Sequence, residues 1–279
     1  MRIGLVGVDG SHAEDFLRHF NIEGRHRDIA VTAFWGGDEA RKAELQALAP
    51  GLRAADSLDR LIADVDAVIV GARHGDLHLP HALPAIAAGK FVFVDKPFTC
   101  TVGNAVALID AAERAGTPLL SGSALRWQAE TVMLKARLAY LDGPFAISGY
   151  GTWYPDSEYG GAIFYAIHTI ELMQELVGTR WSNLRVESGD HPIISYDAGR
   201  ASVTLQLHPL GPNGSSAFGA SVRSRQLTCE TPIPLPDDYM APVTDRIATM
   251  LRTGQGMDRE TLLAPILMMA EIDARLARR

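Results

Sequence analysis

Short apolar runs alternate with helical patterns in the first part of the chain, and this alternation constrains the fold more than any other sequence feature. The run at residues 66–71 is almost continuously apolar, as expected for a strand buried on both faces of a parallel sheet. The candidate strands are residues 2–8, 29–35, 66–71, 91–94 and 118–121, and the candidate helices between them are residues 11–20, 41–48, 58–63, 81–88 and 102–115. This alternation predicts a doubly wound parallel α/β sheet, which we place at residues 1–122.

The pattern changes after residue 122. The candidate helices here are residues 127–141, 161–176, 240–252 and 260–276, and the candidate strands are residues 145–153, 183–187, 201–208, 217–222 and 227–230. Turn residues such as Pro212-Asn213-Gly214 separate the strands, which favours antiparallel neighbours. We therefore predict a second, α+β domain at residues 123–279 with an open, mostly antiparallel sheet. Its last helix is expected to pack back toward the first domain.

Composition excludes several classes of protein. The 279 residues carry a net charge of −7, which offers no electrostatic footprint for nucleic acid or an anionic membrane. No apolar run approaches the ~20 residues that span a bilayer. The sequence starts as a strand and lacks the pattern of a signal peptide, so a cytoplasmic location is expected. Cys100 and Cys229 lack CxxC spacing, which predicts two reduced thiols and no cysteine-based zinc site.

A glycine-containing turn follows the first candidate strand, where dinucleotide-binding domains hold the pyrophosphate. It is an incomplete G-x-G-x-x-G, because Asp9 stands at the second glycine position and His12 at the third. The candidate cofactor residues in this turn are Gly7, Asp9, Gly10, Ser11 and His12. The carboxylate of Asp9 is expected to weaken dinucleotide binding by repelling phosphate. A second interpretation is a capping box in which Ser11 starts the helix.

An acid that binds the ribose is expected at the end of the second strand. The nearest one is Asp38, which lies slightly late in the chain and could equally start the next helix together with Glu39. Arg41 and Lys42 could meet a 2′-phosphate or lie on a solvated helix face. The choice between NAD and NADP therefore stays open.

The strongest local signal is Asp95-Lys96-Pro97 at the end of an apolar strand. Ligands of open α/β sheets bind at the carboxyl ends of the strands, where a lysine ammonium can stabilise a developing alkoxide. Pro97 stiffens the backbone after Lys96, and this peptide bond is a candidate for the cis form. The competing interpretation is a solvated lysine in a surface loop.

With this motif and its surroundings, the chain resembles the Gfo/Idh/MocA oxidoreductases. In that family a strand-end Glu-Lys-Pro carries the reactive lysine, and Asp95-Lys96-Pro97 stands in its place. The family's second-domain signature is a glycine pair followed by a helix with Asp-x-x-x-His-x-x-Asp. Here Gly160-Gly161 precedes a helix in which Phe164 replaces the first Asp, His168 matches the His and Glu171 replaces the second Asp.

The resemblance implies an NAD- or NADP-dependent oxidoreductase that acts on a sugar, a cyclitol or a related small molecule. Lys96 would polarise the reacting oxygen, His168 would be the acid/base, and both would reach one cleft. Tyr165, three residues before His168, shares its helix face and would replace the missing carboxylate as a hydrogen-bond partner. The other candidate cofactor residues are Ala72, Arg73, His74, His78, Asp95, Lys96, Pro97 and Arg126. A homo-oligomer through the C-terminal sheet is also implied.

Two alternatives follow from the departures. Without an acid at position 164, the chain could be a family member that binds a ligand without redox chemistry, or an imine reductase, which needs no such acid. His168 could also be a core histidine on an apolar helix.

A group formed by His74, His78, His81 and Asp76 invites a metal-site interpretation. Pro80 is expected at the first helical position, which would leave His78 in a loop and His81 in a helix. Nothing else marks a closed ligand set, so we predict no metal.

Overall fold

The computed structural model describes residues 1–278, which form two compact units. Residues 1–122 and 238–262 make the first unit, and residues 123–237 and 263–278 the second. The sequence assigns everything after residue 122 to the second domain, whereas the segment 238–262 joins the first unit. Within residues 1–278, no helix has the length and apolar character needed to cross a membrane.

The first unit is built on a six-stranded sheet in which every neighbouring pair is parallel. Its strands are β1 (Arg2–Val6), β2 (Ala30–Trp35), β3 (Arg53–Ala54), β4 (Ala67–Val70), β5 (Phe91–Val94) and β6 (Leu119–Ser121). The order is β3-β2-β1-β4-β5-β6, so the direction of winding reverses between β1 and β4. Ligands of such sheets bind at this reversal, outside the carboxyl ends of the strands.

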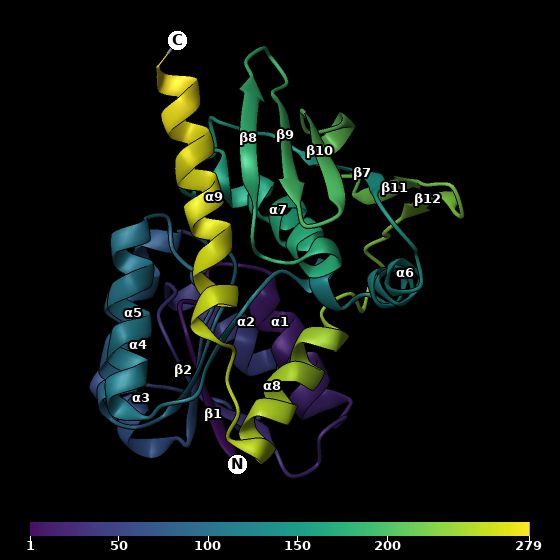
Figure 1. Ribbon diagram of the computed structural model, residues 1–279. Coiled ribbons are helices and arrows are strands. Elements are labelled where there is room, and N and C mark those ends of the chain that lie inside the picture. The colour runs from purple at the N-terminus through teal and green to yellow at the C-terminus, as the bar shows by residue number, and fades with distance from the viewer. Residues whose placement is uncertain (279) are drawn as a thin grey trace. The chain divides into compact units, whose positions relative to one another are not determined.

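Helices cover both faces of this sheet, and β4 is accordingly buried along its whole length. The helices are α1 (His12–Leu17), α2 (Glu39–Leu48), α3 (Leu58–Asp64), α4 (His78–Ala87), α5 (Val102–Ala115) and α8 (Ala241–Thr253). Figure 1 shows α4 and α5 on one side of the strands and α1 and α8 on the other. The predicted doubly wound domain is confirmed.

The second unit contains a six-stranded mixed sheet in the order β12-β11-β7-β10-β9-β8. Its strands are β7 (Phe145–Thr152), β8 (Ser182–Glu187), β9 (Ile193–Ala198), β10 (Ala201–His208), β11 (Gly219–Arg223) and β12 (Thr228–Pro232). Only the β7–β10 pair is parallel, so the expected mostly antiparallel sheet is confirmed. The sequence prediction missed β9.

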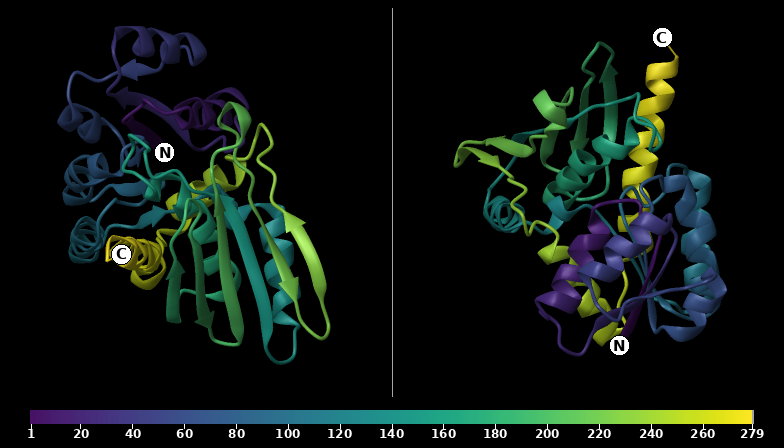
Figure 2. Two further views of the ribbon diagram at one scale, coloured as in Figure 1. Left: turned by 90° about the horizontal axis from the view of Figure 1, so that it is seen from above. Right: turned by 180° about the vertical axis from the view of Figure 1, so that it is seen from behind.

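One face of this sheet packs against α7 (Ile163–Val177), which lies behind the strands in the left view of Figure 2. Burial alternates along β10, whose residues 201, 203, 205 and 207 are buried, while the opposite face is partly exposed. The unit also contains α6 (Ala129–Ala139) and most of α9 (Arg259–Ala277). The single helix predicted at residues 127–141 is wrong at its start, because Gln128 is extended and separates a short 3-10 turn from α6.

One predicted helix start is also wrong, and another is right in position but lacks its predicted cap. The helix α4 begins at His78, so Pro80 lies inside its first turn, where a missing N–H removes no helical hydrogen bond. The side chain of Ser11 makes no capping hydrogen bond. A capping serine needs an extended backbone, whereas Ser11 already has helical angles (φ −68°, ψ −18°).

Gly7→Ala is expected to lower the free energy of unfolding by about 2–5 kcal/mol, because strain and overpacking add there. Gly7 has φ +74°, and a Cβ at this position would lie 2.7 Å from the backbone nitrogen of Ala72. The control is Gly24→Ala, at φ +58° with nothing within 4 Å, which should cost only about 1 kcal/mol. Urea unfolding followed by circular dichroism measures both, and equal losses would contradict the close approach.

Candidate functional site

The turn after β1 and the loop after β4 meet at the reversal point of the first sheet. Gly7 fits against Ala72 only because it lacks a Cβ, and a Cβ on Gly10 would lie 3.2 Å from Cγ of Arg73. Gly36, at the end of β2, has φ +106° and lies against the backbone of Gly7. The backbone of these glycines therefore lies close to the neighbouring loops at the place where a Rossmann domain binds a dinucleotide.

A cavity of about 410 Å³ opens beside this turn. It is lined by Asp9, Gly10, Ser11, Glu14, Gly37, Asp38 and Arg41. The volume lies in the range of small-ligand sites. The glycines, which leave the turn open, and the carboxylates, which can accept hydrogen bonds from ribose hydroxyls, fit the adenosine half of NAD.

Arg41 is held tightly over the glycine turn. Its Nε donates to the carbonyl of Val8 (2.7 Å) and its Nη2 to that of Gly10 (2.9 Å). The guanidinium also pairs with both carboxylate oxygens of Glu14, at 2.5 and 2.7 Å, and with Glu44 at 2.8 Å. The Glu14 hydrogen bonds raise the pKa of Arg41, so this guanidinium is a fixed and largely neutralised charge.

The two acids predicted at the cofactor site have structural partners. The carboxylate of Asp38 accepts from the backbone N–H of Arg41 (2.8 Å) and caps α2, as the helix-start interpretation predicts. Exposed Asp9 accepts from the backbone N–H of Arg73 at 3.3 Å and so joins the two loops. Both carboxylates still line the cavity, and their contact with a cofactor stays a prediction.

His12 is the centre of a hydrogen-bonded chain. Its Nδ1 lies 2.5 Å from the carboxylate of Asp95 and its Nε2 lies 2.8 Å from the hydroxyl of Tyr239. The other carboxylate oxygen of Asp95 accepts from the backbone N–H of Lys96 (2.8 Å). The residue at the third glycine position therefore binds the acid next to the predicted reactive lysine. Tyr239, far along the sequence, has no local pattern that could have revealed this contact.

Lys96 lies at the carboxyl end of β5, buried to 8% exposure, and the predicted cis peptide between Lys96 and Pro97 is confirmed. The buried ring of His78 supports this loop. Its Nδ1 lies 2.9 Å from the carbonyl of Pro97 and its Nε2 lies 2.7 Å from that of Ala72. The ring is fully buried between these two carbonyls and helps to position the lysine loop, and the predicted contact of His78 with a cofactor stays a prediction.

In the second unit, His168 and Tyr165 lie half-buried on α7, with Gly161 and Ala162 just before the helix. Tyr165 and His168 are three residues apart on the helix and both are partly exposed, so they form one accessible stripe. Phe164, in contrast, is buried beside the ring of Tyr159. The predicted shared face of Tyr165 and His168 is present.

A buried network fixes the orientation of His168. Its Nδ1 lies 2.6 Å from the hydroxyl of Ser123, whose backbone N–H donates to Glu171 (2.6 Å). Glu171 also accepts from Nε of Arg126 at 2.7 Å. Ser123 was missed by the sequence analysis, since it lies 45 residues from His168 and carries no motif.

Arg126 is part of this network, and its predicted position near the nicotinamide stays a prediction. Its side chain is 2% exposed, and its guanidinium pairs with Glu171 and, at 3.3 Å, with Glu175. A buried guanidinium with two carboxylate partners has a structural role. Glu171, at the second acidic position of the family signature, orients Ser123 and thereby His168.

Asp95 should stabilise the fold in a pH-dependent way. Burial raises the pKa of its carboxyl, but His12 and Lys96 lower it more, so it lies at about 2 against an ordinary 3.8. This contribution is present above pH 4 and is lost as the pH falls toward 2, and it amounts to about 2 kcal/mol. The difference in unfolding free energy between wild type and Asp95→Asn should therefore shrink over that interval.

The control is Asp28→Asn, which removes a solvent-exposed ion pair with Arg252. Its effect should be smaller and suppressed by salt, which screens exposed pairs. Chemical unfolding at a series of pH values measures both variants. A difference for Asp95→Asn that does not change with pH would contradict the assigned pair.

Glu171→Ala should lower the free energy of unfolding by about 3–5 kcal/mol, because it breaks a buried ion pair from one side. Glu175→Ala is the control, since Glu175 is 21% exposed and Arg126 keeps Glu171 in this variant. It should cost about 1 kcal/mol or less. If the two losses were equal, Glu171 would not be the main partner of Arg126.

The two units define a Rossmann-type dinucleotide domain and a mixed α+β domain on one chain. Residues 1–123 match the Gfo/Idh/MocA family, described as an oxidoreductase family with an NAD-binding Rossmann fold. The resemblance drawn from the sequence is thereby confirmed for this region.

Similar proteins support the same conclusion. The inositol 2-dehydrogenase of Cereibacter sphaeroides is 31% identical over 145 residues, which cover 52% of this chain and 42% of that enzyme. The enzyme of the same name from Rhodococcus erythropolis is 33% identical over 138 residues, 48% of this chain and 39% of the enzyme. The matches thus span less than half the length of these relatives.

Solved structures extend the likeness in fold to the whole chain. GenD2 from gentamicin A biosynthesis, in complex with NAD, has a TM-score of 0.81 at 17% identity and covers 99% of this chain and 94% of its own. A probable dehydrogenase from Thermotoga maritima has a TM-score of 0.82 at 16% identity, with 100% and 97% covered.

Proposed function

We propose that this protein is an NAD-dependent oxidoreductase that acts on a CH–OH group of a sugar, cyclitol or related polyhydroxylated molecule. The observation that carries the proposal is buried Lys96 at the carboxyl end of β5, inside the region that matches the NAD-binding family. The inositol 2-dehydrogenase relatives support the substrate class.

Bound NAD would supply the hydride acceptor, and the protein would handle the proton. The ammonium of Lys96 stabilises the negative charge that develops on the substrate oxygen. His168 accepts the hydroxyl proton at Nε2, the ring nitrogen opposite the one beside Ser123. This role requires that Nδ1 carries a proton and donates to the Ser123 hydroxyl, which can accept it. Ser123 is compatible with this tautomer and holds the ring.

Tyr165 supplies a hydrogen bond to the substrate in place of the family's carboxylate. It lies on the accessible stripe of α7 that also carries His168, whereas the side chain of Phe164 is buried. A phenol with an ordinary pKa of about 10 stays protonated at neutral pH and donates, so it does not act as a strong base.

Lys96→Ala and His168→Ala should each lower turnover by more than about a hundredfold, as expected for loss of a charge-stabilising donor and of a general base. The assay is a screen of cyclitols and sugars with NAD that follows the reduced cofactor. Calorimetric NAD binding by the variants shows that each fold is intact.

Ser123→Ala should shift the pH–rate profile, and Tyr165→Phe should reduce turnover by about tenfold. If Lys96→Ala turned over at the wild-type rate, the proposed role of Lys96 would be contradicted.

Charge in the cavity beside the glycine turn favours NAD over NADP. Its lining includes Asp9, Glu14 and Asp38 but only one cation, Arg41. That cation is already paired with Glu14 and Glu44. A 2′-phosphate would meet three carboxylates and a neutralised guanidinium, whereas ribose hydroxyls can donate to the carboxylates.

We expect NAD to bind at least about tenfold more tightly than NADP, which corresponds to about 1.4 kcal/mol. Glu14→Gln should narrow this ratio, because it frees Arg41 to meet the phosphate and removes one negative charge. Glu44→Gln is the matched control, since Glu44 pairs with Arg41 but does not line the cavity. Calorimetry with both cofactors decides, and an NADP preference in wild type would overturn the charge argument.

A second candidate is a family member that binds a polyhydroxylated ligand without redox chemistry. Phe164 at the family's acidic position and Asp9 at the second glycine position favour it. An imine reductase is compatible with Phe164 as well. Thermal shifts with NAD and NADP test the non-redox candidate, because stabilisation by either cofactor counts against it. Activity with imines would identify the imine reductase.

We also propose a homo-oligomer through the open face of the second unit's sheet. Partly or fully exposed positions recur along this face in β7 and β10, including Ser148, Ser202, Thr204 and Gln206. Light scattering on the purified protein would measure the assembly.

A further inference from the structure

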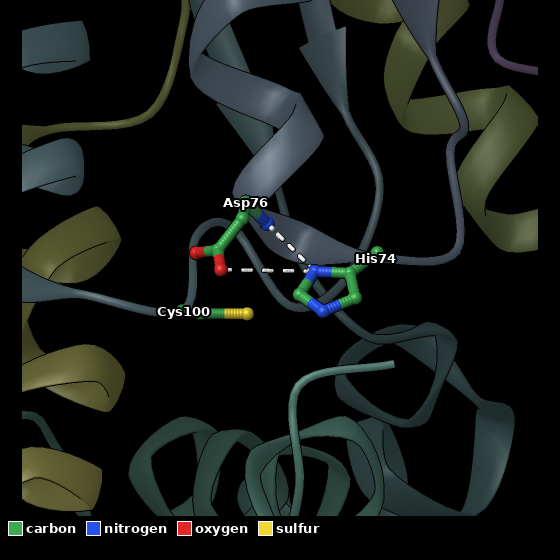
Figure 3. A group of neighbouring side chains, drawn as sticks. All are labelled: His74, Asp76 and Cys100. Carbon is green, nitrogen blue, oxygen red and sulfur yellow. Dashed lines mark hydrogen bonds and ion pairs between the residues drawn. The ribbon is translucent and has the colours of Figure 1, made fainter. Parts of the chain in front are cut away.

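Three side chains with metal-binding atoms gather at the carboxyl edge of the first sheet. His74 and Asp76 come from the loop after β4, and Cys100 comes from the loop after β5. One ligand atom from each lies within 4.8 Å of the others, and Figure 3 shows the three side chains pointing toward one another. None of the three is among Lys96, His168 and Tyr165, which carry the proposed proton and charge transfer, although His74 is also a predicted cofactor residue.

We propose that His74, Asp76 and Cys100 bind one Zn²⁺ ion. Imidazole nitrogen, carboxylate oxygen and cysteine sulfur are all zinc ligands, and a sulfur ligand disfavours Mg²⁺ and Ca²⁺, which prefer oxygen. The sequence predicts no metal because its histidine grouping lacked a closed ligand set. In the structure, Cys100 lies beside His74 and Asp76, whereas His78 and His81 are not part of this cluster.

The distances suit a tetrahedral ion after small side-chain rotations. Nδ1 of His74 lies 3.9 Å from Oδ2 of Asp76. Zinc bonds of about 2.0–2.1 Å place two tetrahedral ligands about 3.4 Å apart. Both side chains are partly exposed and can rotate. The single lone pair of Nδ1 accepts a long hydrogen bond (3.2 Å) from the backbone N–H of Asp76, so zinc binding at this nitrogen must replace that bond as the ring rotates.

Gly75 permits the approach of the cysteine. A Cβ on Gly75 would lie 2.8 Å from Sγ of Cys100 and 3.0 Å from Cγ of Pro97. Any other residue between His74 and Asp76 would therefore push the thiol away from the two other ligands. Glycine at this position joins the loop after β4 to the loop that carries Lys96.

Three protein ligands leave a fourth position for water or a small ligand, as in zinc sites that are not purely structural. The ion would connect the loops after β4 and β5, the same two loops that His78 links through backbone carbonyls. Zinc should thus stabilise the folded first unit by binding it in preference to the unfolded chain. The proposal stands independently of the oxidoreductase function.

Cobalt titration of the chelator-treated full-length protein tests the site. We expect one Co²⁺ per chain, with visible bands of tetrahedral cobalt and a near-ultraviolet band from thiolate to cobalt, all displaced by Zn²⁺. Cys100→Ser should remove the thiolate band, and Cys229→Ser, the matched control, should keep it. Asp76→Asn, at an exposed position, should weaken binding by about tenfold or more with folding unchanged.

The opposite results overturn the proposal. A cobalt spectrum without a thiolate band places the ion elsewhere. If the thiolate band persists in Cys100→Ser and disappears in Cys229→Ser, the metal is bound by Cys229 and the proposal is wrong. If Cys100→Ser fails to fold, unchanged zinc affinity in Asp76→Asn and His74→Ala is sufficient to reject the site. If the wild-type protein showed no NAD-dependent turnover, the cobalt result would be unaffected. The oxidoreductase proposal and the zinc proposal can therefore be rejected independently of each other.

Discussion

The close approach of Gly7 to Ala72 is the constraint on which the first unit depends. Parallel strands all end at one edge of the sheet, so every loop with chemical groups is delivered to that edge. The turn after β1 and the loop after β4 can meet only if no Cβ stands between them. This contact fixes the position of the loop after β4 against the turn after β1. His78 lies between the carbonyls of Ala72 and Pro97, so the loop after β4 in turn fixes the loop that carries Lys96.

A different interaction governs the second unit. The buried pair of Arg126 and Glu171 holds the backbone of Ser123, and Ser123 holds His168. Breaking such a pair from one side leaves an uncompensated charge in the core, so the network favours a single arrangement. The histidine on the accessible stripe of α7 is therefore oriented by groups that touch no solvent.

The parts of the fold that the sequence predicts are those whose signal is local. The strand β5 and the helix α5 have the predicted bounds, because a continuous apolar run and a helix between Thr101 and Gly116 need no distant partner. The two-residue strand β3 and the strand β9 were missed, since a short edge strand has little pattern of its own. Tyr239 and Ser123 were missed for a related reason, because their contacts join residues 227 and 45 positions apart.

The departures from the glycine fingerprint acquire roles once the structure is considered. His12, at the third glycine position, binds Asp95 and so supports the backbone of Lys96. Asp9, at the second, accepts from the backbone of Arg73 and joins the same two loops that Gly7 brings together. An intact fingerprint would remove both contacts. The side chains that weaken the sequence motif therefore strengthen the connection between the glycine turn and the lysine loop, and this connection is what a reactive lysine at the strand edge requires.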